Sequence, residues 1–298
     1  MSISKKLSRK EFLQLSGLAL AGTLLPNAAF AAPARKTGVQ LYTLRDQLPK
    51  DLAGTLKKVA AIGYKEVELF GYGDGKFFGK TPKEFKALLK GLGLAAPSGH
   101  YTTGTSTAMP SAKGTLSNDW NRAVADAAEL GQKYMICAFL LPDERKTLDQ
   151  YKRHIELFNK SAEVCKKSGI QFGYHNHDFE FVPINGQVPY DLILKGTDPK
   201  MVQMELDLYW TSFAKVDALD LFKKHPGRFP MWHVKDMEKR DESKNTEVGK
   251  GRIDYKALLK HASKAGLKYA FVEQETNYAP TPIGSIKTSA SYMRGIQY

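Results

Sequence analysis

Residues 170–177 read IQFGYHNH, an apolar stretch that ends in two histidines. Three later stretches repeat the arrangement, with an apolar run followed by side chains that can bind a metal: VQMELD at 202–207, MWHVKD at 231–236 and YAFVEQE at 269–275. Short apolar runs of this kind are typical of buried β-strands. The pattern therefore predicts four strands that each end in a potential metal ligand.

Helical segments separate these strands from one another and from four further strands upstream. The upstream strands are predicted at residues 39–42, 67–70, 94–100 and 134–139, and helices are predicted at 52–62, 81–91, 117–131, 148–167, 190–195, 216–224, 254–265 and 283–296. Strands that alternate with helices form parallel sheets. Eight such units in about 260 residues favour an α/β fold of the (β/α)₈ TIM-barrel type. No Gly-x-Gly-x-x-Gly turn follows the first strand, which argues against a dinucleotide-binding fold.

The first 31 residues have the pattern of an export signal. Basic residues at positions 5–10 precede the apolar stretch Leu13–Leu25, and Ala29-Phe30-Ala31 offers a cleavage site. The box at Ser8–Leu13 is similar to a twin-arginine signal with Lys10 in place of the second arginine, so the twin-arginine and general secretory routes both stay open. We expect a signal peptide at residues 1–31, a single barrel domain at 32–298, and a periplasmic or otherwise exported protein. The apolar stretch is too short for stable membrane insertion.

The net charge bears on whether the protein binds nucleic acid, and the two cysteines bear on whether it forms a disulfide. The net charge is +13, or +10 without the charged residues of the leader. The lysines are scattered along predicted helices and are not interleaved with aromatic residues, so we expect solvated helix faces and no nucleic-acid partner.

Cys137 lies in an apolar strand and Cys165 in a helix. Export would permit a disulfide between them, but a buried thiol suits Cys137 better. The oligomeric state stays open, a homo-oligomer included.

Active-site residues of a barrel come from the carboxyl ends of its strands. Side chains alternate along a strand, so we expect His175 and His177 to share a face; one would bind a metal and the other would orient it or bind substrate. Glu205 and Asp207 also share a face, and Asp207 is the better ligand because it lies nearer the mouth. A set that mixes nitrogen and oxygen ligands suits a catalytic divalent ion.

The chain resembles the xylose isomerase-like TIM-barrel superfamily, which is also called the sugar phosphate isomerase/epimerase family. The resemblance spans essentially the whole mature chain. It is carried by Val39–Asp46, Gly63–Glu68, Gly173–Phe181, Met204–Trp210, His233–Asp236 and Val272–Glu275.

The resemblance implies one bound divalent ion, whether Mn²⁺, Mg²⁺, Co²⁺ or Zn²⁺. Asp207, His233 and Glu273 match the family's ligands on strands six, seven and eight. His175 stands at the strand-five position, where the sugar epimerases carry glutamate. That departure weakens a symmetric mechanism in which two glutamates exchange protons with opposite faces of one carbon.

The resemblance also implies a sugar substrate, which the predicted export makes non-phosphorylated. Acid–base candidates are Glu273, His177 and Lys235, and substrate-binding candidates are His100, Glu180, Trp210 and Arg252. We expect a metal-dependent isomerase or epimerase that removes a proton next to a carbonyl. A lyase, dehydratase or 3-keto-glycoside-cleaving enzyme would use the same chemistry. An exported sugar-binding protein with a vestigial metal site is a further alternative. A nuclease of the endonuclease IV branch is disfavoured, because the chain has only seven histidines.

Overall fold

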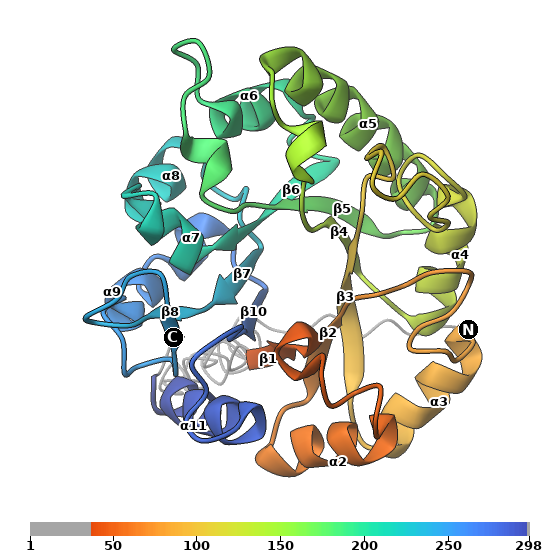
Figure 1. The fold of residues 1–298 in the computed structure, drawn as a ribbon, viewed down its shortest axis with the longest axis vertical. Coiled ribbons are helices and arrows are strands. Elements are labelled where there is room, and N and C mark those ends of the chain that lie inside the picture. Colours follow the sequence, from red (N-terminus) through yellow and green to blue (C-terminus); the bar gives the residue numbers. More distant parts are fainter. Residues whose placement is uncertain (1–36, 297–298) are drawn as a thin grey trace, which may run out of the picture. The chain divides into compact units, whose positions relative to one another are not determined.

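The computed structural model describes residues 37–296, which form a closed barrel of eight parallel strands surrounded by helices (Figure 1). Around the barrel the strands follow the order β1-β10-β7-β6-β5-β4-β3-β2. The predicted (β/α)₈ fold is therefore confirmed. The strands are β1 Thr37–Gln40, β2 Glu66–Leu69, β3 Ala95–Tyr101, β4 Tyr134–Cys137, β5 Gln171–His175, β6 Val202–Asp207, β7 Met231–Val234 and β10 Tyr269–Val272.

The helices begin and end at residues that suit those positions. The Thr81 hydroxyl accepts a hydrogen bond from Glu84 N and the Glu84 carboxylate accepts one from Thr81 N, which together form a capping box. Gly63 ends α2 with a φ of 107°, which only glycine adopts readily. The main helices are α2 Leu52–Ile62, α3 Pro82–Gly91, α4 Trp120–Leu130, α5 Leu148–Lys167, α6 Pro189–Gly196, α7 Leu208–Phe213, α8 Ala218–Lys224, α9 Tyr255–Leu259, α10 Ala262–Ala265 and α11 Pro282–Gly295.

The structure corrects the predicted boundaries in several places, the first of them at β1, which spans 37–40 rather than 39–42 because Leu41–Leu44 form a 3₁₀ turn. Strand β5 ends at His175, so His177 follows the strand rather than continuing it. The helix predicted at 254–265 is two short helices, α9 and α10. A helix that was not predicted, α7, follows β6 directly, because the Asp207 side chain accepts hydrogen bonds from Tyr209 N and Trp210 N and so caps it.

Two small strands lie in the polar loop that follows β7. They are β8 Asp236–Met237 and β9 Asn245–Thr246, and they pair antiparallel. The Asp236 carboxylate accepts hydrogen bonds from the backbone N–H groups of Gly249, Gly251 and Ile253. This carboxylate therefore holds the far end of the loop against the end of β7.

Cys137 and Cys165 are free, buried thiols, which confirms the expectation from the sequence. Among residues 37–296 no helix is both long and apolar enough to cross a membrane. The predicted leader, residues 1–31, lies outside the described residues.

The barrel interior is closely packed, and adding one methyl group tests this packing. A Cβ on Gly38 would lie 2.5 Å from the Phe271 ring and 3.0 Å from the Glu66 carbonyl oxygen. Gly38→Ala should therefore lower the free energy of unfolding by about 1–3 kcal/mol. Gly91→Ala is the matched control, because nothing lies within 4 Å of the added atom. Thermal unfolding would measure both, and equal stability of the two variants would contradict the packing described here.

Candidate active site

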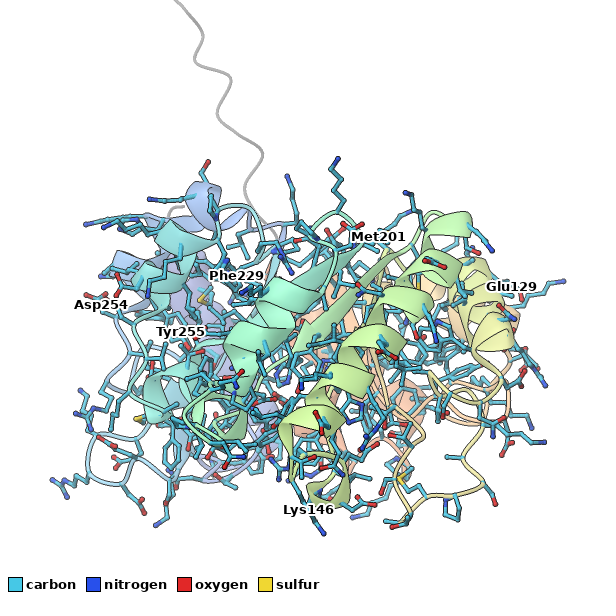
Figure 2. The ribbon with its side chains drawn as sticks, turned by 90° about the horizontal axis from the view of Figure 1, so that it is seen from above. Glu129, Lys146, Met201, Phe229, Asp254 and Tyr255 are labelled. Atoms are coloured by element: carbon cyan, nitrogen blue, oxygen red, sulfur yellow. The ribbon has the colours of Figure 1, made fainter. Side chains whose placement is uncertain are left out.

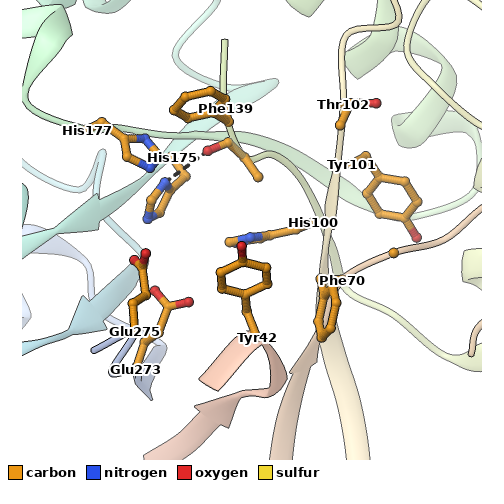
Figure 3. A pocket seen from close by; sticks show the side chains of 12 residues that line it. Tyr42, Phe70, His100, Tyr101, Thr102, Phe139, His175, His177, Glu273 and Glu275 are labelled. Atoms are coloured by element: carbon orange, nitrogen blue, oxygen red, sulfur yellow. Dashed lines mark hydrogen bonds between the residues drawn. The ribbon is translucent and has the colours of Figure 1, made fainter. Parts of the chain in front are cut away.

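A cavity of about 380 Å³ opens at the carboxyl ends of the strands (Figure 3). On one side it is lined by histidines and carboxylates at or just beyond the carboxyl ends of β3, β5 and β10. On the other side it is lined by aromatic rings, with the Tyr42 and Phe70 rings 5.2 Å apart and nearly perpendicular. The lining side chains used below are Tyr42, Phe70, His100, Phe139, His175, His177, Glu273 and Glu275.

Four side chains bring ligand atoms together beside this cavity. His175 Nε2 lies 3.1 Å from His233 Nδ1 and 3.4 Å from Asp207 Oδ2. Glu273 Oε2 lies 3.0 Å from His233 Nδ1. Asp207 and His233 stand opposite each other in the register of β6 and β7, so the parallel pairing sets them at one level. The structure thus gathers the four residues that the sequence predicts as metal ligands.

The arrangement fits a divalent ion. The Nε2, Oδ2 and Nδ1 atoms of His175, Asp207 and His233 all lie within 4.8 Å of one another. Neighbouring donors separated by 3.0–3.8 Å match an ion bound at about 2.1 Å from each. Asp207 Oδ1 caps α7, whereas the buried Oδ2 accepts no well-oriented hydrogen bond from residues 37–296. A buried carboxylate oxygen of this kind is suited to an ion.

The buried Lys235 ammonium balances the carboxylates. Its Nζ lies 3.1 Å from Asp207 Oδ2 and 2.9 Å from Glu273 Oε2, and it donates to Glu275. Burial opposes ionisation of Asp207 and Glu273, but Lys235 and the histidines outweigh it and hold both carboxyl pKa values below their usual range. Both groups are therefore anionic, as metal ligands must be.

The two histidines at the end of β5 are kept neutral. Burial, followed by the nearby charge of His233, lowers the pKa of His175 to about 4. Burial, followed by His175 and Lys235, holds the pKa of His177 well below its usual value. His177 Nδ1 is buried without a hydrogen-bond partner among the described residues, and the ring lines the cavity. A neutral imidazole at a cavity wall can accept a proton from a substrate.

A second polar cluster lies deeper in the barrel, below the predicted ligands. Glu68 Oε2 accepts hydrogen bonds from His233 Nε2 at 2.6 Å and from Gln40 Nε2 at 2.8 Å, and Ser98 donates to its other oxygen. His100 Nε2 bonds Glu205 Oε2 at 2.8 Å. The pKa of His100 rises to about 9 because Glu68 and Glu205 outweigh the effect of burial. This cluster fixes His233 from below, and Glu205 is a buried acid within it.

The other predicted substrate-binding residues are dispersed. Trp210 packs on His177, with ring centroids 5.4 Å apart. Glu180 is buried and accepts hydrogen bonds from Tyr174 Oη and His177 N, so it supports the site rather than facing the cavity. Arg252 lines a separate pocket, where it pairs with Glu242. The structure therefore does not place Glu180 or Arg252 against a substrate in the cavity.

Sequence reasoning missed the residues that complete the site. Tyr42 lies with Phe70 on the aromatic side of the cavity, Phe139 packs against His177 with ring centroids 4.7 Å apart (Figure 3), and Gln40 and Ser98 hold Glu68. Gln40 carried a usable signal, since it is a polar residue in a predicted apolar strand. Tyr42 and Phe139 carried none, because aromatic residues at strand ends are ordinary packing residues.

The chain belongs to the xylose isomerase-like TIM-barrel family, whose model matches residues 56–296. A solved structure described as a sugar phosphate isomerase/epimerase from Parabacteroides distasonis is 31% identical and has a TM-score of 0.74. The match covers 87% of this chain and 97% of that one. A zinc-bound IolI protein has a TM-score of 0.68 at 13% identity, over 88% of this chain and 97% of that one, which shows the fold alone.

Inosose dehydratase from Geobacillus thermodenitrificans is 25% identical over 142 residues, covering 42% of this chain and 47% of that protein. The same enzyme from Bacillus licheniformis is 28% identical over 135 residues, covering 39% and 44%. The matches therefore span about half the length of these curated relatives.

Asp207→Asn tests the predicted ligand set, because asparagine keeps the cap of α7 and removes the negative charge. We expect the affinity for a divalent ion to fall by more than about 100-fold, beyond the usual effect of changing a residue outside the ligand set. Elemental analysis after dialysis against limiting Zn²⁺ would measure it. Asp254→Asn, at the cap of α9, is the matched control. Unchanged metal content in Asp207→Asn would refute the site.

Glu180 predicts a pH dependence of stability. Burial raises the pKa of its carboxyl from 4.5 to about 8. Between these values the folded chain keeps the proton while the unfolded chain loses it, so stability falls as pH rises through this window. Over the same pH range, the free energy of unfolding of metal-free Glu180→Gln should fall by about 1–3 kcal/mol less than that of the unsubstituted protein. Urea unfolding at a series of pH values measures this difference; parallel curves would show that Glu180 ionises normally in the folded chain.

Proposed function

We propose that this protein is a divalent-metal-dependent enzyme that removes a proton next to the carbonyl of a non-phosphorylated sugar or keto-sugar, as an isomerase or epimerase does. The observation that carries the proposal is the position of His177, a neutral imidazole that lines the cavity, beside four converging ligand side chains. The relatives described as isomerase/epimerase and dehydratase support the same class of reaction.

The cavity favours an uncharged substrate. Among the described residues that line it, His100 is the one cationic side chain, and it is already paired with Glu68 and Glu205, whereas Glu273 and Glu275 face the cavity from one side. A phosphate group would need cationic or backbone N–H partners and would be repelled by these carboxylates. The aromatic side of the cavity instead offers flat apolar surface to the C–H face of a sugar ring.

His175, Asp207, His233 and Glu273 would hold the ion, which when bound supplies positive charge that stabilises an oxyanion formed from the carbonyl. His177, whose ring lines the cavity, accepts the proton from carbon. Lys235 is held as a cation, because Asp207, Glu273 and Glu275 outweigh burial and raise its pKa. It orients Glu275, which faces the cavity across from His177 and can exchange a proton with a substrate oxygen.

A lyase is the second candidate, and the unlike pair of proton carriers favours it. Epimerisation at one carbon calls for similar bases on opposite faces, whereas elimination calls for a base at carbon and an acid at the leaving group. His177 and the Lys235–Glu275 pair have that unequal character. Loss of water or of a glycosidic oxygen would then follow proton removal.

Incubation of the metal-reconstituted protein in D₂O with keto-sugars and 3-keto-glycosides tests the proposal. Deuterium in recovered substrate, or a new stereoisomer, supports isomerisation, and release of water or aglycone supports the lyase. His177→Gln should slow either outcome by at least about 100-fold. His261→Gln, an exposed histidine elsewhere on the barrel, should have no effect. Absence of both exchange and cleavage would overturn the proposal and favour a sugar-binding protein.

A further inference from the structure

The positive charge of the barrel is concentrated at the end away from the cavity. Of the chain's 44 lysines and arginines, six lie in residues 1–36, and of its 31 acidic residues one does, so residues 37–296 carry a net charge of +8. The end in question consists of the last turns of the helices and the loops that lead to the next strands. In Figure 2, Met201 and Phe229 mark this end, and Lys146 marks the cavity end.

This end holds thirteen basic residues and three acidic ones, an excess of ten, so the rest of the described chain is close to neutral. The acidic residues are Glu66, Glu129 and Asp198. The basic residues, which we call the basic end, are Lys65, Lys90, Lys133, Lys166, Lys167, Lys195, Lys200, Lys223, Lys224, Arg228, Lys264, Lys268 and Arg294.

Three of these lysines surround one recess. Lys133, Lys166 and Lys200 line a pocket of about 330 Å³ between the starts of β4, β5 and β6. All three are exposed, and no acidic side chain of residues 37–296 pairs with them. The recess therefore presents uncompensated positive charge to whatever approaches this end.

Stabilisation of the helices explains only some of the lysines at the basic end. Lysines in the last turn of a helix interact favourably with its carbonyl end, which accounts for residues such as Lys90 and Lys195. Lys65, Lys133, Lys200 and Lys268 lie in loops just before strands, outside any helix. They gain nothing from a helix dipole and add to the repulsion at this end.

The topology connects the basic end to the predicted leader. Strand β1 begins at Thr37 and runs parallel to its neighbours, so the chain enters the barrel at the basic end. If residues 1–31 direct export, the basic end is the part of the barrel that follows the export segment most directly along the chain until that segment is cleaved.

We propose that the basic end is an electrostatic docking surface for an anionic phospholipid bilayer. Each lysine of a cluster contributes about 1 kcal/mol to binding at such a surface, which raises the partitioning of the protein onto the membrane roughly fivefold. No membrane-spanning helix is needed, because the contact is peripheral. It leaves the cavity, at the opposite end of the barrel, open to solvent. This docking is independent of the reaction catalysed.

Vesicle co-sedimentation of the full chain tests the proposal, with phosphatidylcholine vesicles compared with vesicles that also contain about one-third phosphatidylglycerol. The test variant is Lys133→Gln/Lys166→Gln/Lys200→Gln. The control is Lys83→Gln/Lys113→Gln/Lys146→Gln, which makes the same charge change with exposed lysines outside the basic end. The leader is identical in all three proteins, so its contribution cancels. Thermal unfolding verifies that both variants fold.

We expect the test variant to lose at least about tenfold in affinity for the anionic vesicles and the control to lose less than about twofold, with the difference vanishing at high salt. Equal losses in the two variants, or no preference for anionic vesicles, would overturn the proposal. Displacement by millimolar inorganic phosphate would assign the recess to a soluble anion instead. Binding to duplex DNA that matches or exceeds vesicle binding, and that depends on the same three lysines, would assign it to nucleic acid.

Discussion

The imidazole of His233 is the constraint on which the candidate site depends. Its Nε2 donates to Glu68, and its Nδ1 faces His175, Asp207 and Glu273. Because Glu68 takes one nitrogen, the other is directed toward the predicted ligands, the arrangement that orients histidine in metal sites. The buried ring thus connects the deep cluster to the mouth of the barrel.

The His233 ring also affects the net charge of the candidate site. Glu205, Glu273 and Glu68 outweigh burial and raise the pKa of His233 well above its usual value, so without an ion the ring carries a proton on each nitrogen. An ion bound at Nδ1 would replace one of those protons, which makes metal affinity depend on pH. Lys235 keeps Asp207 and Glu273 ionised meanwhile, so the carboxylates are ready to bind.

The sequence predicted the fold well because each strand and helix carried its own local signal, such as the capping box at Thr81 and the glycine at the end of α2. It also predicted that His175, Asp207, His233 and Glu273 lie close together, since parallel strands bring their carboxyl ends together. It did not predict that Arg252 would pair with Glu242 or that Glu180 would turn toward Tyr174. Those outcomes depend on tertiary contacts of loops, which leave no periodic signal in the sequence.

The aromatic side of the cavity and the buried polar cluster around Glu68 could not be predicted from the sequence, for a related reason. Tyr42 follows β1 in a short 3₁₀ turn, and only the closed barrel brings it across from His175 and His177. Gln40 reaches Glu68 because β1 and β2 pair at that register. Such contacts are set by the shear of the barrel, which no single strand encodes.

X-ray absorption spectroscopy of the zinc-loaded protein tests the central claim most directly, because it reports the ligands rather than the activity. The ion should be bound by nitrogen and oxygen at about 2.0–2.2 Å, with scattering from two imidazole rings, those of His175 and His233. One ring should disappear in His233→Asn. A spectrum without imidazole scattering, or one unchanged by His233→Asn, would contradict the account.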